Sequence, residues 1–258
     1  ASFDLLDYGL GQVVLVEGPD GSGKTRMLQE AARLASVRGI CVLASECPPR
    51  DPDPASPQNA STTLPLGPLA PLFRAIAEQW RVHPDWLPRS NAAVLAPFTP
   101  AIAELGIIED PADLPPDMAR LRVLSAVHEA LQALARDRPL CVVIDDLQWA
   151  DDVTVALLLH LCRAGLLERL PTIFLAAHRT EDATIGLDEL TRLPHVRRVS
   201  LRPLDKDEVA ELAGSMLAVA PPPRDLAHTL FAYTAGLPAF AVELVRAAAE
   251  EGHLRRSG

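Results

Sequence analysis

The chain has 258 residues, and with 24 Lys and Arg against 34 Asp and Glu its formal net charge is −10. Apolar residues make up 48% of the chain and charged residues 22%, a composition that excludes intrinsic disorder and is typical of globular proteins. No apolar run approaches about 18 residues, so we expect no contact with a membrane, and no leader peptide is expected. The acidic balance argues against direct binding of nucleic acid by this segment.

The four cysteines lack the spacing of a metal site. Cys41, Cys47, Cys141 and Cys162 include no CxxC pair, and a buried free cysteine behaves as a small apolar residue. We therefore expect reduced thiols in the core of a cytoplasmic protein.

In chain order, the first half alternates short apolar runs with helical patterns. Strands are predicted at 13–16 and 40–44, with a helix at 24–36 between them. Residues 48–68 are rich in Pro, Asp, Ser, Asn and Thr and are predicted to form a long surface insert. Further helices are predicted at 69–80, 92–105 and 117–136.

The second half continues this alternation and then becomes wholly helical. Strands are predicted at 140–144, 172–177 and 196–201, with a helix at 152–167 that Asp152 could cap. Helices are predicted at 205–217, 224–234 and 238–251. Alternating strands and helices predict an α/β fold with a parallel sheet that is covered on both faces. We expect one large domain over residues 1–203 and a small helical lobe over residues 204–258.

A glycine-rich loop follows the first predicted strand and fits the pattern GxxxxGK[ST]. It reads Gly18-Pro19-Asp20-Gly21-Ser22-Gly23-Lys24-Thr25. Glycines let backbone N–H groups converge on phosphate oxygens, and the following helix directs its positive end to the same anion. Lys24 is expected to reach the β- and γ-phosphates, and the Thr25 hydroxyl is expected to bind Mg²⁺. Lys24 and Lys206 are the only lysines in a chain that otherwise uses arginine.

Two acids end the apolar strand predicted at 140–144. Such a strand lies in the centre of the sheet, so its carboxyl end opens onto the ligand crevice. Asp145 is expected to hold Mg²⁺ through water, as a Walker B aspartate does. Asp146 is placed either to orient or deprotonate an attacking water or to act as a supporting or capping carboxylate. Asp151 and Asp152 are interpreted as helix caps.

The segment around these acids resembles a family signature. STAND-type, AAA-like ATPase domains of large ATP-binding LuxR-family regulators carry DDLQWAD or DDLHWAD, and the segment here is Asp145-Asp146-Leu147-Gln148-Trp149-Ala150-Asp151. Further segments resemble the family in chain order, at 14–18, 23–28, 64–69, 176–181, 201–204 and 234–238. The resemblance implies a P-loop NTPase fold, in which a parallel five-stranded sheet of order 5-1-4-3-2 is followed by the helical lobe.

The resemblance also implies roles for residues outside the two motifs. Arg179 would contact the terminal phosphate, because a guanidinium stays charged and binds phosphate oxygens in pairs; the alternative is a surface arginine. Pro238 would pack near adenine, and it is also suited to the first position of a helix. We expect Arg26 to contact the nucleotide beside the loop. Arg197-Arg198 and Arg255-Arg256 are interpreted as solvated charge.

The family usually carries an hhGRExE element before the first strand, and residues 1–11 contain none. Either the chain begins after that element or the base is bound differently.

These observations favour a regulatory switch that binds ATP or ADP with Mg²⁺ and hydrolyses ATP slowly. DNA-binding and sensory parts of the regulator are expected outside this chain, and self-association could depend on the nucleotide. The alternatives are an oligomeric AAA+ ATPase with sustained turnover, a small-molecule kinase, and a scaffold that binds nucleotide without hydrolysis.

Overall fold

The computed structural model describes residues 2–49, 65–83, 86–98, 103, 114–182, 185–219 and 224–251. Most of the predicted insert at 48–68 lies outside these ranges, and so do Arg255 and Arg256. Among the helices of the described ranges, none is both long and apolar enough to cross a membrane.

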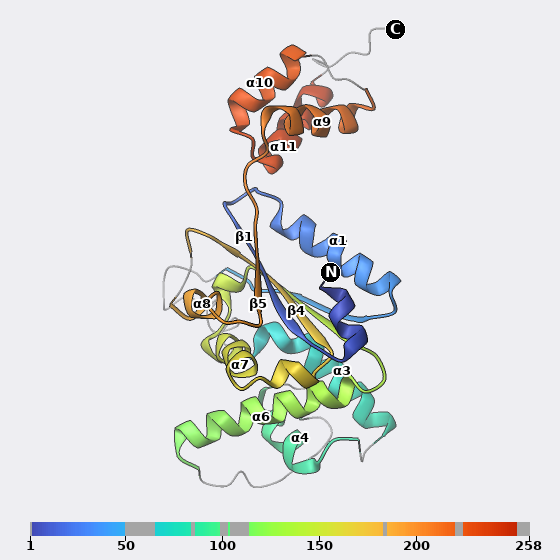
Figure 1. Ribbon diagram of the computed structural model, residues 1–258, viewed down its shortest axis with the longest axis vertical. Helices are drawn as coiled ribbons and strands as arrows, with labels where there is room; N and C mark the ends of the chain where they lie inside the picture. Colours follow the sequence, from blue (N-terminus) through green and yellow to red (C-terminus); the bar gives the residue numbers. More distant parts are fainter. Residues whose placement is uncertain are drawn as a thin grey trace.

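A parallel five-stranded sheet forms the centre of the molecule (Figure 1). The strands are β1 (Gln12–Gly18), β2 (Cys41–Glu46), β3 (Leu140–Asp145), β4 (Thr172–Arg179) and β5 (Val196–Ser200). Their order is β2-β3-β4-β1-β5, and every neighbouring pair is parallel. This is the predicted order 5-1-4-3-2 counted from the opposite edge, so the predicted fold class is confirmed. The carboxyl ends of β1, β3 and β4 therefore meet at one edge.

Helices cover both faces of the sheet, because successive strand side chains point to opposite sides. On one face, Val14 and Val16 of β1 pack with Leu28 of α1 (Lys24–Val37), and the short 3-10 helix Phe3–Tyr8 joins this side. Val13 and Leu15 belong to the larger core on the other face. The helices of that face are α3 (Ala70–Val82), α4 (Arg89–Leu95), α6 (Pro116–Leu134), α7 (Asp152–Arg163) and α8 (Ile185–Leu190).

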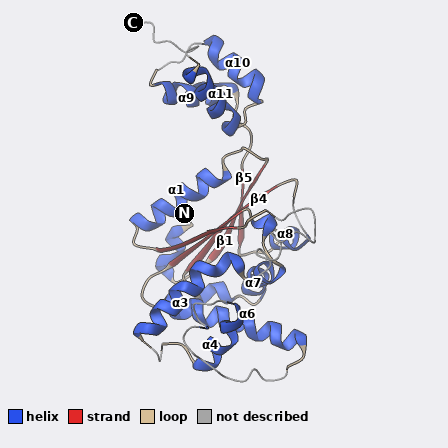
Figure 2. Cartoon of the chain, turned by 180° about the vertical axis from the view of Figure 1, so that it is seen from behind, coloured by secondary structure: helices blue, strands red, loops and turns tan. Residues whose placement is uncertain are grey.

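Three further helices form the lobe at the end of the molecule, beyond the carboxyl ends of the strands (Figures 1 and 2). They are α9 (Lys206–Leu217), α10 (Arg224–Thr234) and α11 (Pro238–Glu250). The lobe has a small core of its own, with Val209, Leu230 and Val245 at its centre. Residues 201–205 connect β5 to α9, and Asp205 begins α9 with a reciprocal capping box to Glu208.

The structure corrects several local predictions. Of the two acids interpreted as caps, Asp151 does cap α7, because its side chain accepts from the N–H groups of Val153 and Thr154, whereas Asp152 is the first residue of the helix. The helix predicted at 152–167 ends at Arg163, since Gly165 adopts a left-handed backbone with φ 65°. Helix α8 was not predicted.

The helix predicted at 92–105 is shorter in the structure. Helix α4 ends at Leu95 and a 3-10 turn follows at Ala96–Phe98. Pro97 has no N–H to continue the helix ladder, which explains the early end. Of the rest of this predicted helix, only residue 103 lies within the described ranges.

The cysteines are free thiols, as predicted. Cys47, Cys141 and Cys162 are buried, and burial raises the pKa of each to about 12. Such thiols stay protonated near neutral pH and are poor nucleophiles. Cys41 is half-buried.

Candidate nucleotide-binding site

The glycine-rich loop joins the end of β1 to the start of α1. Gly21 and Gly23 have φ angles of 74° and 92°, a left-handed conformation that glycine adopts without steric cost. Gly23 is the residue that caps α1, so the chain turns directly from the loop into the helix at Lys24. The loop therefore lies at the positive amino end of α1, which favours bound anions.

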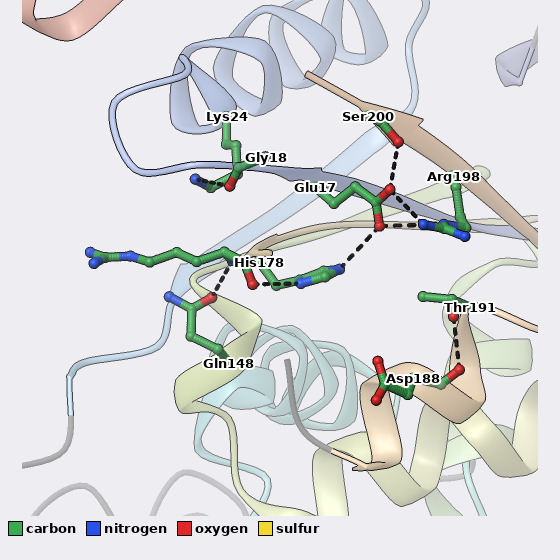
Figure 3. Close-up of polar contacts among 10 residues, drawn as sticks. Glu17, Gly18, Lys24, Gln148, His178, Asp188, Thr191, Arg198 and Ser200 are labelled. Atoms are coloured by element: carbon green, nitrogen blue, oxygen red, sulfur yellow. Dashed lines mark hydrogen bonds and ion pairs between the residues drawn. The ribbon is translucent and has the colours of Figure 1, made fainter. Parts of the chain in front are cut away.

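The Lys24 side chain folds back over this loop. Its Nζ donates to the carbonyl oxygen of Gly18 at 3.0 Å (Figure 3). It also donates to the carbonyl oxygen of Pro19 at 2.9 Å. The residue is only 7% exposed, so the ammonium group is held inside the loop. An ammonium group has three hydrogens, and these two carbonyls use two of them. One donor remains for a phosphate oxygen.

The unused donors of the loop fit a phosphate. The first N–H groups of a helix have no acceptor within the helix. Ser22 Oγ is buried and has no hydrogen-bond partner among the described residues. Together with Lys24, these groups place several hydrogen-bond donors and a positive charge close together at the loop, where a phosphate could bind.

Thr25 and Asp145 supply oxygen atoms beside this loop. Both line a hollow of about 330 Å³ between α1 and the carboxyl ends of β2 and β3. Asp145 is buried, and its Oδ1 accepts from the N–H of Asp146 at 2.9 Å. A hydroxyl and a carboxylate are ligands that Mg²⁺ accepts, in combination with phosphate oxygens and water. The two residues therefore fit the predicted metal site.

Glu46 borders the same hollow and was not predicted as a site residue. It pairs with Asp145 in the register of β2 and β3. The sequence signal was its position at the end of a strand that the predicted sheet order places beside the Asp145 strand.

Asp146 does not use its side chain to cap a helix. Its backbone is left-handed, with φ 52°, and the 3-10 turn that follows receives no side-chain capping bond from it. Instead, Asp146 Oδ1 accepts from Gln148 Nε2 at 2.7 Å. The carboxylate is thus held by an amide. Trp149, half-buried in the same segment, packs against the large core.

Arg179 ends β4 directly beside the glycine-rich loop. Arg179 and Gly18 are partners in the register of β4 and β1. Its Nη2 lies 3.7 Å from Asp20 Oδ1, so the guanidinium faces the loop. The backbone of Arg179 is held on both sides, because its N–H donates to Gln148 Oε1 at 3.2 Å and His178 Nδ1 lies 3.1 Å from its carbonyl oxygen (Figure 3).

The helical lobe contacts the loop through the start of α11. Pro238 is the first residue of α11, and the next N–H, of Ala239, donates to the Gly21 carbonyl at 3.1 Å. Gly236 has a φ of 78°, and a Cβ there would lie 2.0 Å from the Leu204 carbonyl oxygen. Only glycine allows this close approach of the chain to Leu204, two residues before Pro238.

Arg26 lies on the exposed surface of α1. Its Nη2 pairs with Glu30 at 2.7 Å, one helical turn further on. In this structure Arg26 therefore makes a surface ion pair, and its predicted contact with the nucleotide remains a prediction.

Comparison with known protein families agrees with this geometry. The family model described as an AAA ATPase domain matches residues 4–175. The chain belongs to this AAA ATPase domain family. It is therefore a P-loop ATPase domain that binds nucleotide.

Individual relatives are distant. An uncharacterized protein of Rhizobium meliloti (strain 1021), R02095, is 26% identical over 254 residues. The match covers 92% of this chain but 22% of that protein, so this chain spans about a fifth of the length of the relative.

Two solved structures are similar to this chain. Cdc6p from Pyrobaculum aerophilum is similar with a TM-score of 0.50 at 13% identity, over 96% of this chain and 60% of that one. DnaA from Aquifex aeolicus bound to AMPPCP is similar with a TM-score of 0.47 at 15% identity, over 95% of this chain and 58% of that one.

A buried carboxylate lies at the root of the loop of this AAA ATPase domain. Glu17 is 7% exposed and accepts from Arg198 at 2.7 Å and from the Ser200 hydroxyl, and its Oε2 lies 3.9 Å from His178 Nε2 (Figure 3). Burial opposes ionisation of Glu17, but the hydrogen bonds from Arg198 and Ser200 outweigh it, so its pKa is below its ordinary value. Arg198 is itself exposed, as its interpretation as solvated charge expects, and in addition it pairs with this buried acid.

We expect Glu17→Gln to lower the free energy of unfolding by about 1–2 kcal/mol at pH 7, because charge-assisted hydrogen bonds are lost. Since the pKa of Glu17 is lowered in the folded state, this stabilisation is present above the ordinary value of 4.5 and is lost as the pH falls through the folded-state pKa. Urea unfolding of both proteins across this range measures the difference. A difference that stayed constant down to low pH would contradict the ionised state of Glu17.

Proposed function

We propose that this AAA ATPase domain is a nucleotide-dependent switch of the STAND type, in a larger cytoplasmic bacterial transcription regulator of the LuxR type. It binds ATP or ADP with Mg²⁺ between the sheet and the helical lobe and hydrolyses ATP slowly. The DNA-binding and sensory parts belong to the rest of the larger protein, and self-association depends on the nucleotide. The much longer relative supports a multidomain protein, and the DDLQWAD segment supports the family.

The orientation of the Arg179 guanidinium is the main support for the proposal that this domain is a switch. A ligand shifts an equilibrium between two conformations only if it contacts one conformation more favourably. The Arg179 guanidinium faces the loop and is paired there with Asp20 at 3.7 Å. A γ-phosphate is a stronger partner than this exposed carboxylate, so ATP would draw Arg179 to itself, whereas ADP would leave it with Asp20.

The helical lobe receives this change through the loop. The Gly21 carbonyl accepts from Ala239 at the start of α11, so a shift of the loop backbone moves the contact that holds the lobe. The proposed output is therefore a change in the orientation of the lobe relative to the sheet.

For hydrolysis, we propose in-line attack of water on the γ-phosphorus. Lys24 and the loop N–H groups hold the β- and γ-phosphates, and Asp146 orients the water and accepts its proton. The bond from the γ-phosphorus to the bridging oxygen breaks, which releases ADP and phosphate. Thr25 and Asp145 would hold Mg²⁺, whose charge offsets that of the phosphate oxygens.

Titration calorimetry with Mg²⁺ tests the switch. We expect the wild-type domain to bind ATP about 10- to 100-fold more tightly than ADP, because a charge-assisted contact to the γ-phosphate is worth a few kcal/mol. Arg179→Ala should bring the two affinities close together by weakening ATP binding alone.

Arg169→Ala is the matched control, since Arg169 is exposed and lies before the opposite end of β4. It should keep the wild-type preference. Equal affinities of the wild-type domain for ATP and ADP would remove the basis of the switch. Turnover per subunit that rises steeply with protein concentration would instead indicate an oligomeric AAA-type motor.

A further inference from the structure

Gln148 connects the two residues that the proposed hydrolysis and the proposed switch depend on. Its Nε2 donates to Asp146 Oδ1 at 2.7 Å, and its Oε1 accepts from the backbone N–H of Arg179 at 3.2 Å. The side chain is only 8% exposed, so water competes little for either bond. Figure 3 shows the amide reaching from the segment after β3 toward the end of β4.

The chemistry of the two contacts assigns the amide orientation. A carboxylate only accepts, so it must face the NH₂ group, and a backbone N–H only donates, so it must face the carbonyl oxygen. Only a side chain of this length that has both a hydrogen-bond donor and an acceptor at its end can make the two bonds together. Glutamate of the same size could keep the second bond and would lose the first.

The bond to Asp146 has a direct consequence for its carboxylate. Oδ1 accepts from Gln148, and this hydrogen bond restrains rotation of the carboxylate group. The left-handed backbone of Asp146, with φ 52°, limits its other conformations. A fixed carboxylate can hold an attacking water in one direction, and such positioning supplies a large part of the rate of phosphoryl transfer.

The bond to Arg179 holds the backbone of the arginine that faces the loop. The amide N–H of Arg179 is bound by Gln148, and its carbonyl oxygen lies against the His178 ring, so the side chain can reorient while the peptide stays fixed. A guanidinium that starts from a fixed point reaches the γ-phosphate with less loss of conformational entropy.

We infer that Gln148 is a positioning residue that orients the Asp146 carboxylate for water and anchors Arg179 for contact with the γ-phosphate, through opposite ends of one amide. This inference rests on the proposed function. It predicts that the two effects can be separated by choosing which end of the amide is removed.

Three single variants separate the effects. Gln148→Leu removes both bonds, so we expect a 10- to 100-fold lower kcat and a several-fold smaller preference for ATP over ADP. Gln148→Glu keeps an oxygen that can accept from the Arg179 N–H, but it places a second carboxylate next to that of Asp146. We therefore expect kcat to fall as much as in Gln148→Leu, whereas the preference for ATP over ADP should stay within about twofold of the wild-type value. Gln132→Leu, at a half-buried glutamine of α6, is the control and should leave both measurements unchanged.

A double-mutant cycle tests whether Gln148 acts through Asp146. If it does, adding Gln148→Leu to Asp146→Asn lowers kcat no further, because the group that Gln148 orients has already lost its function. A full additional loss would overturn the inference. Binding of ATP by a variant shows that its nucleotide site is folded. If Gln148→Leu does not fold, the kcat of Gln148→Glu tests the effect on hydrolysis instead.

Failure of the proposed function and failure of the Gln148 inference give different results. A wild-type domain without ATP preference and without turnover contradicts the proposed function. A wild-type domain with both, whose Gln148→Leu and Gln148→Glu variants match it in kcat and in ATP preference, overturns the inference alone.

Discussion

Lys24→Ala is expected to abolish measurable binding of ATP and ADP, with a loss of affinity of roughly 100-fold or more. The reason is geometric as well as electrostatic. The ammonium group is held inside the loop by the Gly18 and Pro19 carbonyls, so its charge is already at the phosphate position before a ligand arrives. Its removal takes away a charge-assisted hydrogen bond and leaves the phosphates facing carbonyl dipoles. Titration calorimetry with Mg²⁺ measures the loss.

Two further variants test whether the loss of binding is specific to the Lys24 ammonium group. Lys206→Ala removes the other lysine, which is exposed at the start of α9, and should bind ATP as the wild type does. Lys24→Arg keeps the charge but replaces a compact ammonium group by a planar fork, which does not fit between the two carbonyls. We expect this variant to bind weakly as well. Wild-type affinity in Lys24→Ala would refute the phosphate site.

The second large effect is expected from Asp146→Asn. This change keeps the size of the side chain and should leave ATP affinity within about twofold of wild type, because Asp146 contacts no phosphate in the proposed site. It removes the group that accepts the proton of the attacking water, which lowers kcat by about 10²- to 10⁴-fold. Phosphate release under saturating ATP measures the rate.

Asp152→Asn is the matched control for this prediction. Asp152 is exposed in the first turn of α7, and the contact it makes with Arg120 uses its backbone carbonyl, which the substitution keeps. Its kcat should equal that of the wild type. A fully active Asp146→Asn protein would instead leave Glu46, which borders the same hollow, as the carboxylate to test next.

Much of the fold could be read from the residues because its signals are local. The apolar runs at 13–16 and 140–144 and the glycines between Gly18 and Lys24 each specify a strand or a turn over a few residues, and the structure confirms these elements. Helix ends were less reliable. Asp151 and Asp152 are both acids at the start of α7, and only backbone geometry distinguishes the cap from the first helical residue.

Some residues of the candidate site could be predicted from local sequence patterns, and others could not. Lys24, Thr25, Asp145 and Asp146 belong to two short motifs, so a sequence pattern identified them. Gln148 lies within the DDLQWAD segment, but that pattern gave it no role, because its importance depends on the end of β4, 31 positions further along the chain. Glu17 and Arg198 are separated by 181 positions and meet because β1 and β5 are neighbours in the sheet.

The amino-acid sequence alone therefore sufficed for the candidate phosphate-binding loop and the helical lobe, since each follows from residue types over short distances, whereas the strand order followed from the resemblance of the motifs to a known family. The folded chain was needed to see what holds that chemistry in place: the amide between Asp146 and Arg179, the buried acid beneath the loop, and the contact of α11 with Gly21. These are contacts between residues far apart in the chain, and their geometry depends on how the sheet and the lobe pack together, which no local pattern encodes.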